Sequence, residues 1–371
     1  MKVLHAAFAY KPSPGVVNQM LWESRAAGSS GLEWSVFLYC SELPNVSEHE
    51  RFIELSKAAV AKRGVGRAVS WLIFRMRFYR RLRELSRGKD VLLLRYSSYD
   101  PLQLLFILFA KVPVVLVHHT IEYDEVRAKE RSGAKLLAEF EALLGWVSLR
   151  LASGIVGVTR EIAQYENGRV GFSKRSFVYP NGIVLDGKRL ADERGDTPEL
   201  LFVASYFADW HGLDLVIDAF SGSAHSFKLH LVGAVPPELE QVVKADPRYV
   251  LHGTLSSEDI AKLACRCWVG LSSFALYRKG LQEACTLKVR EYLAVGLPVY
   301  AGHQDVFPES FEFYRNGRAE AGQILEFAFY CRKVSRESVA GAAREFIDKK
   351  DLLLRLYHEL RERNFESTGQ R

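Results

Sequence analysis

The sequence predicts an α/β protein with two doubly wound, parallel-sheet domains. Two series of short, continuously apolar segments run along its 371 residues, and longer helical patterns separate them. Continuous apolar strands, unlike alternating ones, are typical of sheets that are buried on both faces by crossover helices. The length exceeds the roughly 250–300 residues at which a single core stops growing. An apolar content of 48% excludes a disordered chain.

The first series of predicted strands would form the sheet of an N-terminal domain over residues 1–183. Its members are Val3–Ala9, Trp34–Tyr39, Val91–Arg95, Val114–His118, Gly154–Val158 and Ser176–Val178.

The second series would form the sheet of a C-terminal domain over residues 184–349. Its members are Leu200–Ala204, Lys228–Val232, Tyr249–Leu251, Val269–Leu271 and Pro298–Tyr300. The boundary is placed here because 184–198 is the most polar stretch between two strand signals. Helices are expected near 323–333, 335–347 and 350–363, and we expect the last, up to about residue 365, to pack back on the first domain.

The net charge of +6 is concentrated in one segment, because residues 61–90 hold ten basic and two acidic side chains. A helix over 67–87 would align an apolar stripe, namely Trp71, Phe74, Phe78, Leu82 and Leu85. Six arginines lie opposite or beside the stripe: Arg75, Arg77, Arg80, Arg81, Arg83 and Arg87. An arginine-rich face with an aromatic stripe is typical of a helix on anionic lipid, and we favour that partner. The alternative is a core stripe with solvated arginines.

The remaining composition favours a cytoplasmic protein. Five cysteines are an odd and sparse set, which indicates free thiols in a reducing compartment. No secretory signal is recognisable, and the apolar stretch 101–117 is interrupted by Lys111 and Pro113, so no membrane span is expected. The basic segment carries no recognisable nucleic-acid-binding module, so no nucleic acid is expected as a partner.

The strongest chemical signal lies at 283–298. Thr286 is placed to cap a helix from about Leu287 to Val295, and Gly296 with Pro298 would end it. The unpaired N–H groups at such a helix start suit a phosphate. Lys288 lies in the first turn, where its charge opposes the helix dipole unless an anion binds nearby. A solvated helix carrying a chance pair of glutamates, Glu283 and Glu291, remains the alternative.

This segment resembles a known family signature. Glu283-x7-Glu291 followed by Tyr-Leu-Ala-Val-Gly-Leu-Pro-Val is similar to the E-x7-E motif of retaining glycosyltransferases of family 4, which have the GT-B fold. Further matches follow the family's order: Tyr179-Pro180-Asn181-Gly182-Ile183, Trp210-His211-Gly212-Leu213, Leu231-Val232-Gly233 and His252-Gly253-Thr254. The resemblance implies two Rossmann-like domains facing a central cleft. It is greatest to bacterial members that build surface polysaccharides such as lipopolysaccharide, capsule or exopolysaccharide.

The resemblance also implies roles for individual residues. Glu283 would face the hydroxyls of the donor sugar, and Glu291 would bind the ribose of the nucleotide. Thr286 and Leu287 would offer N–H groups to the diphosphate. The remaining donor contacts would come from Gly15, in a loop after the first strand, and from His252, Gly253 and Thr254 near the base.

One departure from the family pattern concerns the diphosphate clamp. The family's arginine and lysine after the first strand of the second domain are replaced here by Ser205 and His211. Lys288, helped by the helix start and His211, would then supply the missing charge. No Asp-x-Asp follows a strand, so we expect neither a metal nor any cofactor beyond the nucleotide-sugar donor.

Two histidines end the fourth strand of the first domain. His119 falls where the family keeps a histidine against the donor sugar, whereas His118 is interpreted as a strand-end residue bonded to its neighbours. Three carboxylates follow on a predicted loop: Glu122, Asp124 and Glu125. They would bind acceptor hydroxyls or solvate a helix start.

Together these features predict a metal-independent hexosyltransferase, peripheral on the cytoplasmic membrane face. It would move a sugar with retention from a nucleotide-diphosphate donor to an oligosaccharide or polyprenyl-linked acceptor. Two alternatives remain: a nucleotide-sugar epimerase of the same architecture, and an inactive nucleotide-binding or scaffold protein. A dinucleotide oxidoreductase is disfavoured, because neither predicted domain has G-x-G-x-x-G after its first strand.

Overall fold

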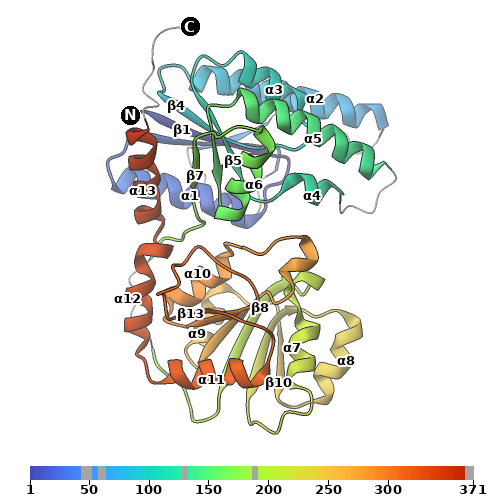
Figure 1. Ribbon diagram of the computed structural model, residues 1–371, viewed down its shortest axis with the longest axis vertical. Helices are drawn as coiled ribbons and strands as arrows, with labels where there is room; N and C mark the ends of the chain where they lie inside the picture. The colour runs from blue at the N-terminus through green and yellow to red at the C-terminus, as the bar shows by residue number, and fades with distance from the viewer. Residues whose placement is uncertain (43–51, 57–63, 128–132, 186–190, 364–371) are drawn as a thin grey trace. The chain divides into compact units, whose positions relative to one another are not determined.

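In the computed structural model the chain divides into two α/β units (Figure 1). Unit 1 comprises Met1–Pro180 and Lys349–Arg371, and unit 2 comprises Asn181–Asp348. The structure describes residues 1–42, 52–56, 64–127, 133–185 and 191–363. Parts of three predicted segments lie outside these ranges: 186–190 of the polar boundary, 61–63 of the basic segment and 364–365 of the last helix.

Unit 1 is built on a seven-stranded sheet with the order β3-β2-β1-β4-β5-β6-β7, and each neighbouring pair is parallel. The six predicted strands are confirmed to within one residue at each end, and β3 was not predicted. The strands are β1 (Val3–Ala9), β2 (Trp34–Cys40), β3 (Ile53–Leu55), β4 (Val91–Arg95), β5 (Val114–His118), β6 (Gly154–Gly157) and β7 (Ser176–Val178).

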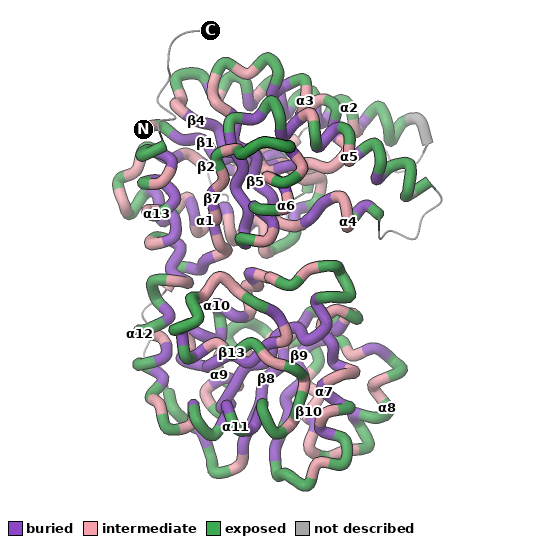
Figure 2. Tube along the Cα trace, viewed as in Figure 1, coloured by how far each residue is buried: buried purple, intermediate pink, exposed green. Residues whose placement is uncertain are grey.

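Helices cover both faces of this sheet (Figure 1). One face packs against α2, α3 and α5, and the other against α1 and the C-terminal helix α13. Figure 2 shows the strands as the buried interior. The helices of unit 1 are α1 (Pro14–Ser29), α2 (Gly64–Leu85), α3 (Pro101–Leu108), α4 (Glu122–Arg127), α5 (Ala134–Leu151), α6 (Arg160–Val170) and α13 (Lys349–Glu362).

The apolar stripe predicted on α2 is core, so the prediction that it contacts lipid is wrong. Phe74, Phe78 and Leu82 are fully buried against the sheet. Arg75 is buried as well, and its Nε donates to Asp100 Oδ2 at 2.9 Å. Arg81 pairs with two glutamates, Glu54 at 2.9 Å and Glu84 at 3.0 Å. Neither Arg75 nor Arg81 is therefore a free surface cation.

The apolar stretch 101–117 forms α3, a short turn and β5, as predicted. Asp100 caps α3 by accepting from the N–H groups of Leu102 and Gln103. Among the helices that the structure describes, none has both the length and the apolar character of a membrane span.

Unit 2 is built on a six-stranded parallel sheet with the order β10-β9-β8-β11-β12-β13. The five predicted strands are confirmed, although β8, β9 and β10 each run two residues further, and β13 was not predicted. The strands are β8 (Glu199–Tyr206), β9 (Lys228–Ala234), β10 (Tyr249–Gly253), β11 (Val269–Ser272), β12 (Val299–Ala301) and β13 (Tyr314–Asn316).

The helices of unit 2 alternate with these strands. They are α7 (Leu213–Phe220), α8 (Pro237–Ala245), α9 (Ser257–Ala264), α10 (Leu287–Ala294), α11 (Ala321–Arg332) and α12 (Arg336–Ile347), with short 3₁₀ turns η1 (Asp209–His211) and η2 (Leu276–Lys279).

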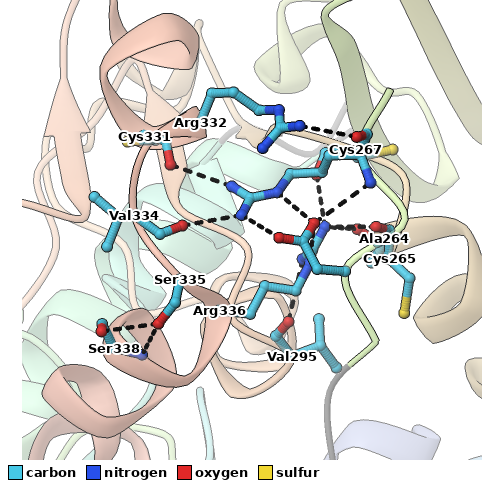
Figure 3. A network of polar contacts seen from close by, with 12 residues as sticks. Ala264, Cys265, Cys267, Val295, Cys331, Arg332, Val334, Ser335, Arg336 and Ser338 are labelled. Atoms are coloured by element: carbon cyan, nitrogen blue, oxygen red, sulfur yellow. Dashed lines mark hydrogen bonds and ion pairs between the residues drawn. The ribbon is translucent and has the colours of Figure 1, made fainter. Parts of the chain in front are cut away.

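Arg336 connects α12 to the end of α9 and the turn that follows it (Figure 3). Its guanidinium is buried and donates to the carbonyl oxygens of Ala264, Cys265 and Cys267, each at 2.8 Å. A longer bond at 3.3 Å reaches the carbonyl of Val295, just after α10. One arginine thus links α12 to the connection between α9 and β11 and to the end of α10.

Gly233 is the glycine of the Leu-Val-Gly motif, and the packing around it shows why this position needs a glycine. It is the penultimate residue of β9, with φ +119°, and a Cβ built there would lie 1.5 Å from the carbonyl oxygen of Ala204 on β8. The β8–β9 register shifts at the same place, between Val203 and Tyr206. Only glycine allows this close approach of the two strands.

Candidate functional site

The candidate site of unit 2 lies where its strand order reverses. β8 and β11 are neighbours in the sheet, and the chain continues from them to opposite sides. Open parallel sheets bind ligands beyond the carboxyl ends of strands at such a switch point. The segments that follow these two strands are 207–212 and 273–286. Most of the donor-site residues predicted in unit 2 lie in or next to these segments.

The two segments are joined to each other. The N–H of Phe274 donates to the carbonyl of His211 at 2.9 Å. Gly212 has φ +68°, and a Cβ there would lie 3.0 Å from the backbone nitrogen of Ala275. The glycine of the Trp-His-Gly motif therefore permits the close packing that fixes His211 beside the second segment.

The first turn of α10 contains two buried polar atoms without a partner. Thr286 occupies the N-cap position with extended backbone angles, but its side chain makes no cap hydrogen bond, so that part of the prediction is wrong. Among the described residues, Thr286 Oγ1 and Lys288 Nζ are both buried with no hydrogen-bond partner. The unpaired N–H groups of the helix start lie in the same turn. An anion bound there would satisfy all of these groups.

Burial destabilises the charged ammonium form of Lys288. Burial lowers its pKa to about 8, and the charge of Glu291 offsets only part of this effect. Its Nζ lies 5.7 Å from the centre of the Phe202 ring. The protein atoms around Glu291 raise the pKa of its carboxyl, while Lys288 lowers it. Burial therefore disfavours both charged groups, and each partner offsets part of the effect on the other.

His211 is neutral at pH 7. Burial, followed by the charge of Lys288, lowers its pKa to about 4. The N–H of Ala208 donates to His211 Nδ1 at 3.1 Å, so the neutral ring carries its proton on Nε2. His211 thus offers a hydrogen-bond donor, and not the fixed cation that the family pattern has at this position.

Glu283 lies on the segment before α10, outside the helix as predicted. Backbone hydrogen bonds hold this segment beside Gln304, which follows β12: Ala284 N–H to Gln304 O at 3.0 Å, and Gln304 N–H to Gln282 O at 2.9 Å. Glu291 lies in the second turn of the helix. The E-x7-E spacing therefore spans a fixed extended segment and the start of α10.

A buried ion pair between Arg290 and Asp305 helps to hold the segment before α10 in place. This pair was not predicted from the sequence. Both side chains of the Arg290–Asp305 pair are fully buried, with two N–O distances of 2.5 Å. Arg290 Nε also donates to the carbonyl of Asn181 at 3.1 Å, and the Asn181 amide donates to Cys285 O at 2.7 Å. Asn181 belongs to the Tyr-Pro-Asn-Gly motif, and that motif was the one available signal.

The other predicted donor residues of unit 2 are more dispersed. Ser205 is exposed near the end of β8. His252, Gly253 and Thr254 lie at the end of the edge strand β10, where His252 Nε2 is 2.9 Å from Nδ1 of His230. Burial, followed by the charge of Arg266, lowers the pKa of His252.

In unit 1 the two neighbouring histidines differ in environment. His118 is fully buried, stacks on Tyr96 and donates from Nδ1 to Glu122 Oε2 at 2.9 Å, which fits its interpretation as a strand-end residue. Burial lowers the pKa of His118, but Glu122 and Glu166 outweigh this effect and raise it. Burial and the charge of Arg95 lower the pKa of His119 well below its ordinary value, so that ring is neutral at pH 7.

Two predictions of local structure in unit 1 are wrong. Gly15 does not lie in a loop: Ser13 caps α1, and Gly15 is in its first turn. The carboxylates of Glu122, Asp124 and Glu125 lie in the first turn of α4 and not on a loop. Glu122 is buried against His118, so it does not offer its carboxylate to an acceptor.

One group of potential metal ligands occurs among the described residues. His118, Glu122 and Glu166 are buried with ligand atoms within 4.8 Å of one another. Arg169 pairs with Glu166 at 2.8 Å, and His118 already donates to Glu122. The group therefore contains two ion-paired contacts, while His118 Nε2 and Glu166 Oε1 are buried without a hydrogen-bond partner in the described structure.

Residues 197–333 match the family model for glycosyl transferases group 1. The matched segment contains every donor-site residue that was predicted in unit 2. Gly15 and His119 lie outside it. A search of curated proteins gave no match.

Solved structures similar to the whole chain are glycosyltransferases of GT-B type. Sucrose-phosphate synthase from Thermosynechococcus elongatus has a TM-score of 0.67 at 15% identity, over 98% of this chain and 99% of that one. HepE of Anabaena in complex with UDP has a TM-score of 0.65 at 14% identity, over 98% and 100%. The lipopolysaccharide outer core galactosyltransferase WaaB has a TM-score of 0.64 at 12% identity, over 98% and 100%. The chain therefore has the GT-B fold, as predicted.

Proposed function

We propose that this protein is a glycosyltransferase that moves a hexosyl group from a nucleoside-diphosphate sugar, with retention at the anomeric carbon. The observation that carries the proposal is the first turn of α10, inside the segment that matches the glycosyl transferase family model. Thr286 Oγ1 and Lys288 Nζ are buried there without partners in the described structure, beside the free N–H groups of a helix start. A diphosphate has the charge and the acceptors that these groups lack.

A uridine nucleotide is the first candidate donor. HepE, which shares this fold, has been solved with UDP and with UDP-glucose. In this chain the diphosphate would accept from the N–H of Leu287, from Thr286 Oγ1, from Lys288 Nζ and from His211 Nε2. Glu291 would accept from the ribose hydroxyls, and Ser205 and 252–254 would lie toward the nucleoside.

The proposed chemistry depends on charge stabilisation. The bond from the anomeric carbon to the β-phosphate oxygen breaks as the acceptor oxygen bonds to that carbon, and the acceptor proton passes to the leaving phosphate. Lys288 and the helix N–H groups stabilise the negative charge that develops on the diphosphate. Glu283 and His119 would orient the donor sugar, and the ammonium group makes a metal ion unnecessary.

The acceptor class follows from the same resemblance. We propose an oligosaccharide or a polyprenyl-linked saccharide in the synthesis of a cell-surface polysaccharide, at the cytoplasmic face of the membrane. The fold shared with WaaB and with WaaG, a glycosyltransferase involved in lipopolysaccharide biosynthesis, supports this class. On α2, the arginines available for an anionic membrane are Arg77, Arg80, Arg83 and Arg87, which are exposed.

A thermal-shift screen of UDP, GDP, dTDP and their sugars tests the donor site. A ligand that binds only the folded state raises the melting temperature, so one nucleotide series should stabilise the chain. Lys288→Ala should weaken binding of that nucleotide by about 10- to 100-fold, since a buried charge-assisted contact is lost. Lys262→Ala, an exposed lysine on α9, is the matched control and should bind as the unaltered chain does.

Turnover tests the transfer itself. Glu283→Ala should lower the transfer rate by at least about 100-fold while nucleotide binding persists, because its assigned contact is to the sugar. Isomerisation of the free nucleotide sugar without acceptor would identify an epimerase instead. Nucleotide binding without either reaction would identify a scaffold protein.

A further inference from the structure

Three helices of unit 1 expose large apolar side chains on the same side of the sheet. α3 contacts both α2 and α5, and the three helices cover one sheet face (Figure 1). Of 21 large apolar side chains exposed in the described part of the chain, 13 belong to α2, α5, or α3 with its cap residue Phe109. We call the exposed side chains of these helices the outer helical face. A concentration of exposed apolar side chains on neighbouring helices is typical of an interaction site in soluble proteins.

The α5 part of the outer helical face has regular helical spacing. Leu136, Phe140, Leu143 and Trp146 follow one another at intervals of three or four residues, so they project from one side of the helix. Leu136 is 78% exposed and Trp146 is 42% exposed. The guanidinium of Arg150, one turn further, lies 4.8 Å from the Trp146 ring centre. This row combines an apolar body with a cationic end.

The α3 part continues the apolar surface between its two neighbours. Leu105, Leu108 and Phe109 are exposed, and Phe109 reaches 63%. Lys111, two residues after Phe109, is exposed too. The buried residues of α3, Phe106 and Ile107, face the sheet, so the exposed ones are not needed for the core.

The α2 part divides along its length into an apolar and a basic half. Val69, Leu72, Ile73 and Met76 are exposed over residues 69–76, before the exposed arginines begin. These are not the residues of the stripe that the sequence suggested, which forms the core. They lie on the side of the helix opposite to that stripe. On this side the arginines occur only toward the C-terminal end of α2.

The basic half of α2 gives the outer helical face its charge. Arg77, Arg80, Arg83 and Arg87 are exposed in and just after this half. The exposed acidic residues of the three helices are Glu84 and Glu139. Glu84 pairs with Arg81 at 3.0 Å and, more loosely, with Arg80 at 3.9 Å, so one carboxylate is shared between two arginines and the basic half keeps a net positive charge. The surface is therefore apolar with a cationic border.

We propose that the outer helical face docks on a bilayer that contains anionic phospholipid. Exposed leucine, phenylalanine and tryptophan side chains enter the interfacial region of a bilayer, and arginines beside them bind lipid phosphates. The biological purpose rests on the proposed function, because a polyprenyl-linked acceptor is reached at a membrane. The binding itself is measured without donor or acceptor.

Sedimentation of the full chain with phospholipid vesicles tests this surface. Vesicles of phosphatidylcholine with phosphatidylglycerol should bind the protein, and vesicles of phosphatidylcholine alone should bind it far more weakly. Added salt should release it. Brominated lipids should quench its tryptophan fluorescence, and Trp146→Phe should remove most of that quenching while binding persists.

Variants separate the charged and apolar contributions. The triple change Arg77→Gln, Arg80→Gln and Arg83→Gln should weaken binding about 100-fold, because each cation near an anionic surface contributes to the affinity. Phe140→Ser with Leu143→Ser should weaken it by a similar factor. Val242→Ser, an equally exposed apolar residue on α8 of unit 2, is the matched control and should change nothing.

Three results would overturn the proposal. They are an absence of vesicle binding, binding unaffected by both sets of variants, and a dimer that Phe140→Ser converts to a monomer, which would assign the face to a second copy. Failure of the donor proposal has a different signature: vesicle binding would remain although no nucleotide stabilises the chain.

Discussion

Lys288 shows how a single side chain can oppose folding in order to serve a site. Its pKa falls from 10.5 in water to about 8 in the folded chain, mainly through burial. Since one pKa unit corresponds to about 1.4 kcal/mol, the protonated lysine destabilises the fold by about 3 kcal/mol at neutral pH. A positive charge in the first turn of a helix is unfavourable unless an anion binds beside it.

Replacing this lysine should therefore stabilise the protein. Lys288→Met should raise the free energy of unfolding at pH 7 by up to about 3 kcal/mol, because the methionine has no charge to desolvate. The folded pKa lies below the unfolded one, so the gain is complete below pH 8 and disappears as the pH rises toward 10.5. Urea denaturation at pH 7 and pH 10 measures both values.

Lys262→Met is the control for this comparison, since Lys262 is exposed and should change stability little at either pH. Equal or lower stability of Lys288→Met at pH 7 would show that the ammonium has partners in solution. That result would remove the main support for an anion site.

At the level of helices and strands, local sequence patterns predicted well where each element lies in the chain. They predicted poorly which other residues its side chains contact. The apolar strands of both sheets were placed correctly, because burial on two faces needs continuous apolar residues. β3 and β13 were missed because each has three residues, with mainly polar or exposed side chains. The helix over α2 was also predicted, but the burial of Arg75 depends on Asp100, which is distant in sequence.

The junction of β8 and β9 offers a direct test of close backbone packing. Gly233→Ala should lower the free energy of unfolding by about 3 kcal/mol or more, because its Cβ would overlap the carbonyl of Ala204 and φ is positive there. Gly341→Ala is the matched control: it lies in α12 with open space around its Cβ position, and alanine should stabilise that helix by about 0.5–1 kcal/mol. Chemical denaturation compares the two, and equal effects would contradict the packing argument.

At the scale of the whole molecule, the C-terminal helix α13 decides which residues complete unit 1. α13 follows unit 2 in sequence but packs in unit 1, where Leu353, Leu356 and Leu360 join the core beside α1. The hydroxyl of Tyr357 accepts from the N-terminal amine of Met1 at 3.0 Å. Unit 1 is therefore complete only after the last helix has been made.

A charged side chain introduced on the buried side of α13 should lower the stability of unit 1 and leave that of unit 2 unchanged. Leu356→Glu should destabilise unit 1 by at least about 3 kcal/mol, because it buries a carboxylate without a partner, whereas Leu356→Met should cost less than about 1.5 kcal/mol. Scanning calorimetry should show one transition lowered and the transition of unit 2 unchanged. A uniform decrease of both transitions would mean that the units unfold together.

Only part of the candidate site could be predicted from the sequence. The E-x7-E spacing, the helix start and the position of Lys288 follow from local residue order, and the structure has all three. The unpaired state of Thr286 Oγ1 could not be predicted, since a threonine before a helix ordinarily caps it. Gly15 was misjudged although Ser13 and Pro14 are a helix-start signal, because the family comparison favoured a loop.

Residue order alone determined the two series of buried strands, the helices between them and the segment most suited to an anion, because these depend on periodicity and on neighbours within a few positions. Folding decided which side of α2 is core, which arginines remain at the surface and how the Arg290–Asp305 pair supports the site. Those outcomes depend on contacts between residues far apart in the chain, and burial then sets the charge state and the exposure of each group.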